Sequence, residues 1–283
     1  MMTERRSLNN IENEDLEIRL FLEAIFIKYG YDFRDYSKAH LKRRILHRLA
    51  LSELSSISQM QHQVLYDRAF LDTVLNDLSI NVTEMFRDPP FYKAFRQEVV
   101  PVLKTYPFIK VWHAGCSSGE EVYSMAILLK EEGLYERTQI YATDFNVEVL
   151  EKAEQAIYSI DSIKDYTYNY QQSGGLASFA DYYIARYDSV ILDHALKKKI
   201  IFADHNLVTD GVFGEMHVVI CRNVLIYFNK HLQNKAFKLF YDSLCNGGFL
   251  GIGTKESLRF SDYIEKFDTI SEELKIYQKR FEA

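Results

Sequence analysis

Cysteine and proline are scarce in this 283-residue chain, which contains 3 of the former and 4 of the latter. An odd number of cysteines argues against a disulfide framework, and Cys116, Cys221 and Cys245 lack the close spacing of metal ligands. The sequence therefore predicts no disulfides and no metal site. The low proline content indicates few rigid linkers.

Long apolar runs are also absent. No run approaches the ~18 apolar residues of a membrane-spanning helix, and the polar start MMTERRSLNN has no apolar core of a signal peptide. A net charge of −6 argues against broad nucleic-acid binding. We therefore expect a cytoplasmic protein that neither inserts into membranes nor binds nucleic acid, with a monomer as the default.

The first 78 residues show helical periodicity. Apolar residues at spacings of three and four predict buried helix faces, formed by Leu16, Leu20, Ala24 and Ile27 and then by Leu41, Ile45 and Leu49. We expect a flexible polar lead-in at 1–15 and a small all-α domain at 16–78.

A row of cations accompanies the second of these helical segments, at Lys42, Arg43, Arg44 and Arg48. Such a row is usually a solvated helix face. The functional alternative is a docking surface for an acidic protein, and both interpretations stay open.

From residue 110 the pattern alternates between strand and helix, which is typical of a parallel sheet covered on both faces. The stretch KVWHAGCSSGEE places Gly115 and Gly119 in a turn between a strand and a helix, where a ligand can approach the backbone closely. Glu120 and Glu121 would repel the phosphates that such turns often bind. They favour a cationic or zwitterionic ligand such as S-adenosylmethionine, although they also complement the positive helix end.

Polar residues follow the predicted strands. Asp144 ends the strand at 140–143, where an acidic side chain can hold ribose hydroxyls; the alternative is an N-cap of the next helix. Asn206 and Asn223 follow two later strands. Because ligands of open α/β sheets bind at the carboxyl ends of the strands, we expect these residues to share one site with Gly115.

Residues 159–197 interrupt the alternation of strands and helices. This tyrosine-rich stretch is too long for a plain connection, so it predicts an inserted subdomain or lid. Alternating fragments such as 183–187 are typical of short antiparallel strands, whose free edge could accept a peptide.

Five stretches in this order resemble one known family: INVTEMFRDPPFY, VWHAGCSSGEEVYSMA, YATDFNVEVLEKAEQAIY, CRNVLIYF and GGFLGIGTKESL. The chain, from about residue 16 to its end, is similar to the CheR-type chemotaxis methyltransferases. These transfer a methyl group from S-adenosylmethionine to glutamate side chains of chemoreceptors, leaving S-adenosylhomocysteine. Thr254-Lys255 departs from the His-Ser pair common in the family, whereas Glu256 is kept.

The resemblance implies an α/β fold: a class I (Rossmann-like) methyltransferase domain at 110–283 with a small antiparallel β-subdomain inserted at about 159–197. The all-α domain precedes it, and 79–109 forms a linker and helix that contribute to the cofactor site. The implied cofactor contacts are Asn81, Thr83 and Arg87 closing over it, Gly115 and Glu121 at its methionine part, Asp144 at its ribose, and Asn206, Leu207, Asn223 and Val224 along its adenine and methionine ends.

The resemblance also implies that Tyr227 stands near the reacting methyl. A glutamate with a pKa of about 4.3 is already ionised at pH 7, so the reaction needs positioning rather than a strong base. We therefore assign Arg87 to steering the substrate carboxylate and Tyr227 to orienting it. Cys116 and Cys221 are expected to be packing residues.

Two other functions stay open. One is methylation of a different protein target, or of a small molecule, by the same fold. The other is a non-catalytic cofactor-binding scaffold or sensor, against which the intact Arg87, Asp144, Asn223 and Tyr227 argue.

Overall fold

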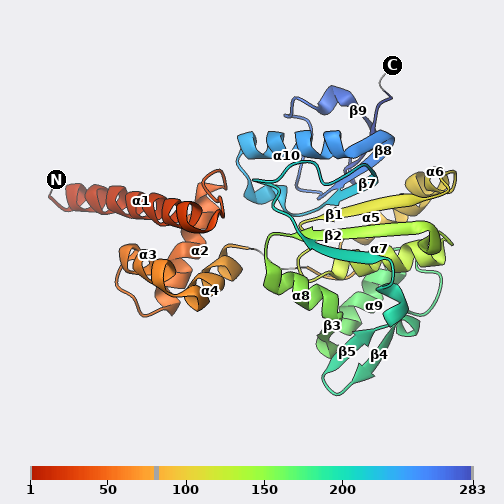
Figure 1. Cartoon of the computed structure of the whole chain (residues 1–283), viewed down its shortest axis with the longest axis horizontal. Helices are drawn as coiled ribbons and strands as arrows, with labels where there is room; N and C mark the ends of the chain where they lie inside the picture. The colour runs from red at the N-terminus through yellow and green to blue at the C-terminus, as the bar shows by residue number, and fades with distance from the viewer. Residues whose placement is uncertain (1, 80–82, 282–283) are drawn as a thin grey trace. The chain divides into compact units, whose positions relative to one another are not determined.

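The computed structural model describes residues 2–79 and 83–281, with side chains from Asn13 onward. The chain forms two compact units. One contains residues 1–80 and 227–232, and the other contains residues 81–226 and 233–283. Figure 1 colours the chain from red at the N-terminus to blue at the C-terminus.

The first unit is built from helices, drawn red to orange in Figure 1: α1 (Met2–Tyr29), α2 (Lys38–Leu51), α3 (Ile57–Tyr66) and α4 (Arg68–Leu78). Ser56 and Asp67 begin α3 and α4, because their side chains accept hydrogen bonds from the free backbone N–H groups of Gln59 and Phe70. Apolar residues of all four helices are buried in this unit.

Helix α1 differs from the sequence expectation in two ways. Residues 2–15, expected as a flexible lead-in, are helical, and no glycine or proline interrupts the stretch from Met2 to Tyr29. The expected buried face is also wrong, since Leu16, Leu20 and Ile27 are exposed. The buried face instead carries Phe21, Leu22 and Ile25, which follow the same helical spacing.

The second unit contains a seven-stranded sheet in the order β6-β2-β1-β7-β8-β10-β9. Strands β6, β2, β1, β7 and β8 run parallel, and β10 is antiparallel to both β8 and β9. The bounds are β1 (Ile109–Ala114), β2 (Thr138–Asp144), β6 (Ile200–Asp204), β7 (Met216–Cys221), β8 (Leu244–Ile252), β9 (Phe267–Ser271) and β10 (Ile276–Lys279). This arrangement confirms the predicted Rossmann-like fold.

Three helical segments precede β1: α5 (Pro89–Ala94), the π-helical turn Phe95–Val99 and α6 (Val100–Leu103). Helices α7 (Glu120–Glu131), α8 (Val147–Gln155) and α10 (Lys230–Ser243) follow β1, β2 and β7. Helix α7 is buried along nearly its whole length, and Val122 and Met125 on it belong to the core. Only residues 115–119 separate β1 from α7, so the sheet and this helix together fix the glycine turn.

A small antiparallel sheet interrupts the alternation, as predicted. Its strands β3 (Ile157–Ser159), β5 (Ser189–Leu192) and β4 (Tyr183–Arg186) lie in that order, and α9 (Ile163–Gln172) belongs to the same insertion (Figure 1). The buried carboxylate of Glu131, at the end of α7, accepts hydrogen bonds from the hydroxyls of Tyr170 and Tyr182. These bonds tie the insertion to the helix that begins at the glycine turn.

Within the described ranges, no helix is both long and apolar enough to cross a membrane.

Candidate cofactor site

The turn after β1 is fastened to the end of β2. The backbone N–H groups of Gly115 and Cys116 both donate to the carbonyl of Thr143, at 2.8 and 2.9 Å. The next N–H group, that of Ser117, donates to Oδ2 of Asp144 at 2.9 Å. The two strand ends that the sequence singled out therefore form one local structure.

Gly115 is required at its position for two reasons. Its φ of +78° lies in the left-handed region, which costs other L-residues roughly 1–2 kcal/mol. A Cβ here would also lie 2.7 Å from Cγ2 of Val224. The predicted contacts Gly115 and Val224 are thus neighbours, with the valine packed over a backbone that has no side chain.

Gly115→Ala is expected to weaken binding of S-adenosylhomocysteine by about tenfold or more, because the added methyl displaces either the turn or Val224. Isothermal titration calorimetry measures this, with Gly174→Ala as a control at a positive-φ glycine where a Cβ would meet nothing within 4 Å. Equal affinities of the two variants would contradict the close packing at Gly115.

Asp144 is 7% exposed and does not cap the next helix. The N-cap of α8 is Asn146, whose side chain accepts from the N–H of Glu148 at 3.0 Å. Burial raises the pKa of Asp144, and hydrogen bonds from backbone N–H groups, including that of Ser117, partly offset this effect. Each carboxylate oxygen can accept more than one hydrogen bond, so Asp144 keeps acceptor capacity for a ligand hydroxyl.

Asn206 and Leu207 lie beside Asp144. The N–H of His205 donates to the backbone carbonyl of Asp144 at 3.2 Å, which holds the segment after β6 against the end of β2. The side-chain oxygen of Asn206 accepts from the N–H of Val208 at 2.9 Å, and Leu207 is buried. The third parallel strand end thus joins the site.

The end of β7 provides Asn223 and Val224. Asn223 has a φ of +63°, a conformation that asparagine tolerates better than most residues. Val224 follows it and packs on Gly115. The described part of the site therefore brings Gly115, Asp144, Asn206, Leu207, Asn223 and Val224 together around the carboxyl ends of β1, β2, β6 and β7.

A buried ion-pair network adjoins these strand ends. The guanidinium of Arg222 donates to Glu121 at 2.9 Å and to Asp88 at 2.7 Å, and it also donates to the backbone carbonyl of Arg87 at 3.2 Å. On its other side Glu121 accepts from Nδ1 of His113 at 3.1 Å. Sequence reasoning missed Arg222 and His113, although both lie within quoted motifs, at a strand end and inside a strand.

The ionised form of Glu121 contributes stability that depends on pH. Burial by itself would raise the pKa of Glu121, but the hydrogen bond from His113 and the charge of Arg222 outweigh it and hold this pKa below its ordinary value. A depressed folded-state pKa gives stability that is fully present above the unfolded-state value of about 4.3 and is lost as the pH falls through the folded-state pKa.

The free energy of unfolding should therefore differ between wild type and Glu121→Gln by a constant amount above about pH 5. The difference should shrink as the pH falls below about 4. Urea unfolding between pH 7 and pH 3 measures it, with the exposed Glu265→Gln as control. A difference that does not change with pH would contradict an ionised Glu121.

The remaining predicted residues are Asn81, Thr83, Arg87 and Tyr227. Asn81 is outside the described residues. Thr83 is half-buried, and Arg87 is half-buried with its backbone held by Arg222. Tyr227 belongs to the first unit, where its ring meets that of His40 edge-on at 5.5 Å between centroids.

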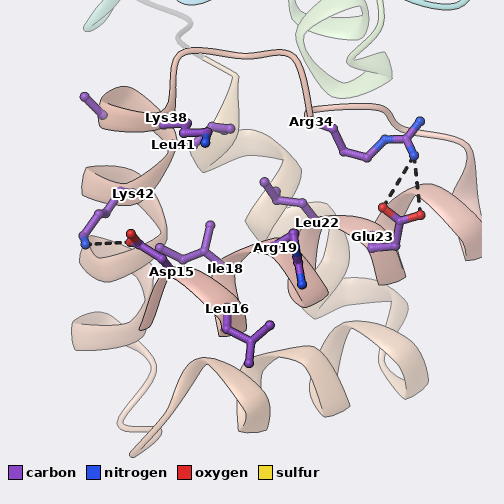
Figure 2. Close-up of a pocket in the computed structure, with 11 residues that line it drawn as sticks. Asp15, Leu16, Ile18, Arg19, Leu22, Glu23, Arg34, Lys38, Leu41 and Lys42 are labelled. Atoms are coloured by element: carbon purple, nitrogen blue, oxygen red, sulfur yellow. Dashed lines mark hydrogen bonds and ion pairs between the residues drawn. The ribbon is translucent and has the colours of Figure 1, made fainter. Parts of the chain in front are cut away.

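Most of the cation row on α2 is engaged inside the first unit. Lys42 reaches Asp15 at 3.0 Å and Glu14 at 2.6 Å, beside a pocket of about 680 Å³ between α1 and α2 (Figure 2). Arg44 and Arg48 both bond to Asp77 of α4, through its carbonyl and its carboxylate. Arg43 is exposed and forms no ion pair or hydrogen bond with the described residues.

The residues present fit an adenosyl ligand. The hydroxyl of Ser117 is buried in the turn without a hydrogen-bond partner among the described residues, and Gly115 leaves the backbone open beside the acceptor Asp144. Burial raises the pKa of both Cys116 and Cys221, which agrees with packing roles for these thiols. The sheet order and the strand-end site define a Rossmann-like methyltransferase.

Comparison with known proteins identifies the family. A family model described as the CheR methyltransferase SAM binding domain matches residues 81–275, and one for the CheR all-alpha domain matches residues 16–79. The chain belongs to the CheR methyltransferase family.

Three curated relatives match over 88% or more of their own length. A Pseudomonas putida KT2440 protein named Cher3 is 54% identical over 267 residues, covering 94% of this chain and 98% of that protein. Chemotaxis protein methyltransferase 2 of Vibrio cholerae is 30% identical over 265 residues, covering 89% and 88%. A chemotaxis protein methyltransferase of Listeria innocua is 29% identical over 240 residues, covering 84% and 88%.

Proposed function

We propose that this enzyme transfers the methyl group of S-adenosylmethionine to glutamate carboxylates in the cytoplasmic part of a chemoreceptor, giving glutamate methyl esters and S-adenosylhomocysteine. The observation that supports this most is the convergence of Gly115, Asp144, Asn206 and Asn223 at the carboxyl ends of four adjacent parallel strands. Chemotaxis methyltransferases among the relatives support the choice of substrate.

The chain's own residues divide the work between binding and positioning. Asp144 holds ribose hydroxyls. Gly115 and Val224 shape the cofactor cradle, by which we mean the space at the carboxyl ends of β1, β2, β6 and β7. Asn206, Leu207 and Asn223 line this space. Asn81 and Thr83 contribute from the linker. S-adenosylmethionine supplies an electrophilic methyl on sulfonium sulfur, and the ionised substrate glutamate is the nucleophile. No protein residue has to be alkylated or to remove a proton.

Glu121 has a less direct role than a simple ligand contact. Both of its carboxylate oxygens already accept hydrogen bonds, Oε1 from His113 and Oε2 from Arg222. Each oxygen can accept a further hydrogen bond, so Glu121 can still accept one from the amino group of the methionine part of the cofactor. Its charge also keeps Arg222 in place, so we assign Glu121 to cofactor binding and to holding the linker near Arg87.

Docking of an acidic protein is assigned chiefly to Arg43. It is the member of the α2 cation row whose charge faces solvent without an internal partner among the described residues, whereas Lys42, Arg44 and Arg48 stabilise helix packing. A rim cation of this kind mainly accelerates encounter with an acidic surface. The contribution of this row to recognition is therefore smaller than four cations would suggest.

Methyl transfer to chemoreceptor-containing membranes tests the proposal. With S-adenosylmethionine carrying a radiolabelled methyl, we expect label in the receptor band that alkali releases as volatile methanol, the signature of a carboxyl ester. Receptor whose methylated glutamates are replaced by alanine is the control. Alkali-stable label would contradict carboxylate methylation, and base-labile label on a different protein would contradict the chemoreceptor substrate.

A further inference from the structure

Another buried carboxylate, that of Glu256, is bonded to the turn after β7 and does not belong to the ion-pair network. Glu256 follows β8 and is 5% exposed. Its Oε2 accepts from the backbone N–H groups of Gly253 at 2.5 Å and Asn223 at 3.2 Å, and its Oε1 accepts from that of Ile226 at 3.3 Å. These donors from the described part of the chain are neutral backbone N–H groups, so the carboxylate stabilises the backbone around it.

The backbone around Glu256 is shaped to receive this side chain. A Cβ on Gly253 would lie 2.8 Å from Oε2 of Glu256 and 2.9 Å from the backbone nitrogen of Asn223. Asn223 itself is in the left-handed region, an uncommon conformation for a residue other than glycine. The turn after β7 therefore needs an external acceptor for its N–H groups, and Glu256 is that acceptor.

We infer that Glu256 is a positioning residue for methyl transfer, which fixes the turn at 223–226 so that Asn223 and Val224 meet the cofactor. The inference rests on the assignment of Asn223 and Val224 to cofactor binding. Glu256 acts through its hydrogen bonds to Asn223 and Ile226. Gly253 preserves the space for the carboxylate, which explains the glycine directly after β8.

Glu256→Gln separates positioning from space filling, because glutamine has the same size but presents an NH₂ group to N–H donors. We expect the Kd of S-adenosylhomocysteine and the KM of S-adenosylmethionine to rise about tenfold or more, with a smaller change in kcat. The exposed Glu265→Gln is the matched control and should bind like wild type. Wild-type affinity of Glu256→Gln would overturn the inference.

A double-mutant cycle with Asn223→Ala gives a readout that a general structural role would not produce. If Glu256 acts through the turn, the fold-change of the double variant should be smaller than the product of the two single fold-changes, because part of the effect of Glu256 passes through the Asn223 side chain. Fold-changes that multiply would overturn the inference. If Asn223→Ala alone binds normally, the cofactor assignment of Asn223 fails, which is a separate result from normal binding by Glu256→Gln.

If circular dichroism shows that Glu256→Gln does not fold, Gly253→Ala tests whether Glu256 positions the turn at 223–226. This variant keeps the carboxylate but displaces it with a methyl group. It should weaken S-adenosylhomocysteine binding to a similar extent, whereas wild-type affinity would overturn the inference.

Discussion

Replacing Arg87 with alanine is expected to lower kcat by about 100-fold or more, the cost of misplacing a reacting group. The Kd of S-adenosylhomocysteine should change far less. In the proposed reaction the nucleophile is the ionised glutamate of the substrate, and we assign Arg87 to steering it toward the methyl group. Losing that guidance lowers turnover while the cradle at Gly115 and Asp144 stays intact.

The structure supports this assignment through the backbone on both sides of Arg87. Phe86 and Asp88 have φ values of +53° and +55°, and left-handed backbone at residues other than glycine is concentrated at functional sites. The N–H of Phe86 donates to Ser124 Oγ at 2.8 Å, and Asp88 pairs with Arg222. Hydrogen bonds therefore hold the residues on both sides of Arg87 in place.

Steady-state kinetics with chemoreceptor membranes, together with calorimetry of S-adenosylhomocysteine, measures the effect of Arg87→Ala. The matched control is Arg280→Ala, which removes an exposed arginine paired with Asp268 at the far end of the chain. Wild-type kcat in Arg87→Ala would contradict its steering role. A parallel loss of kcat and cofactor affinity would assign Arg87 to cofactor binding instead.

Replacing Arg222 with methionine is expected to lower the free energy of unfolding by about 3–5 kcal/mol, as removal of one partner of a buried ion pair does. Methionine has a length similar to that of arginine and fills most of the same space. The loss of stability therefore measures the contribution of the charged group rather than that of packing. Removing the guanidinium leaves the carboxylate of Glu121 buried. Among the described residues, His113 is then the one side chain that still donates a hydrogen bond to it. The guanidinium also lies over the ring of Phe91, 4.3 Å from its centroid.

Urea unfolding at pH 7 measures this loss. Arg280→Met is the control, since exposed pairs contribute about 0–1 kcal/mol. Adding Glu121→Gln to Arg222→Met should restore part of the stability, because the unpaired buried charge is then gone. A loss below about 1 kcal/mol for Arg222→Met would contradict the buried network.

The strand ends could be read from the sequence because short apolar runs followed by Gly, Asp or Asn have few structural interpretations. Gly115, Asp144, Asn206 and Asn223 each follow such a run, and parallel strands place their carboxyl ends along one edge. The sequence pattern therefore predicted which strand ends the structure brings together. It also located the antiparallel insertion, because a long stretch without the strand–helix rhythm requires a structure of its own.

The pairings of charged residues could not be read in this way. Glu121 and Arg222 are 101 residues apart, and Glu256 bonds to a turn 33 residues away, so neither partner follows from local spacing. The cation row on α2 looked solvated for the same reason, whereas Asp77 of α4 engages Arg44 and Arg48. On α1, two faces share the helical period, and tertiary packing selected the one with Phe21.

Calorimetric titration of S-adenosylhomocysteine into wild type and Asp144→Ala tests the cofactor site most directly. Asp144 anchors the glycine turn through Ser117 and is assigned to the ribose, so the variant should lose at least about 100-fold in affinity, as expected for two hydrogen bonds to a charged group. Asp161→Ala, in the insertion, should bind like wild type. Equal binding by Asp144→Ala and wild type, or no binding by wild type, would contradict the site described above.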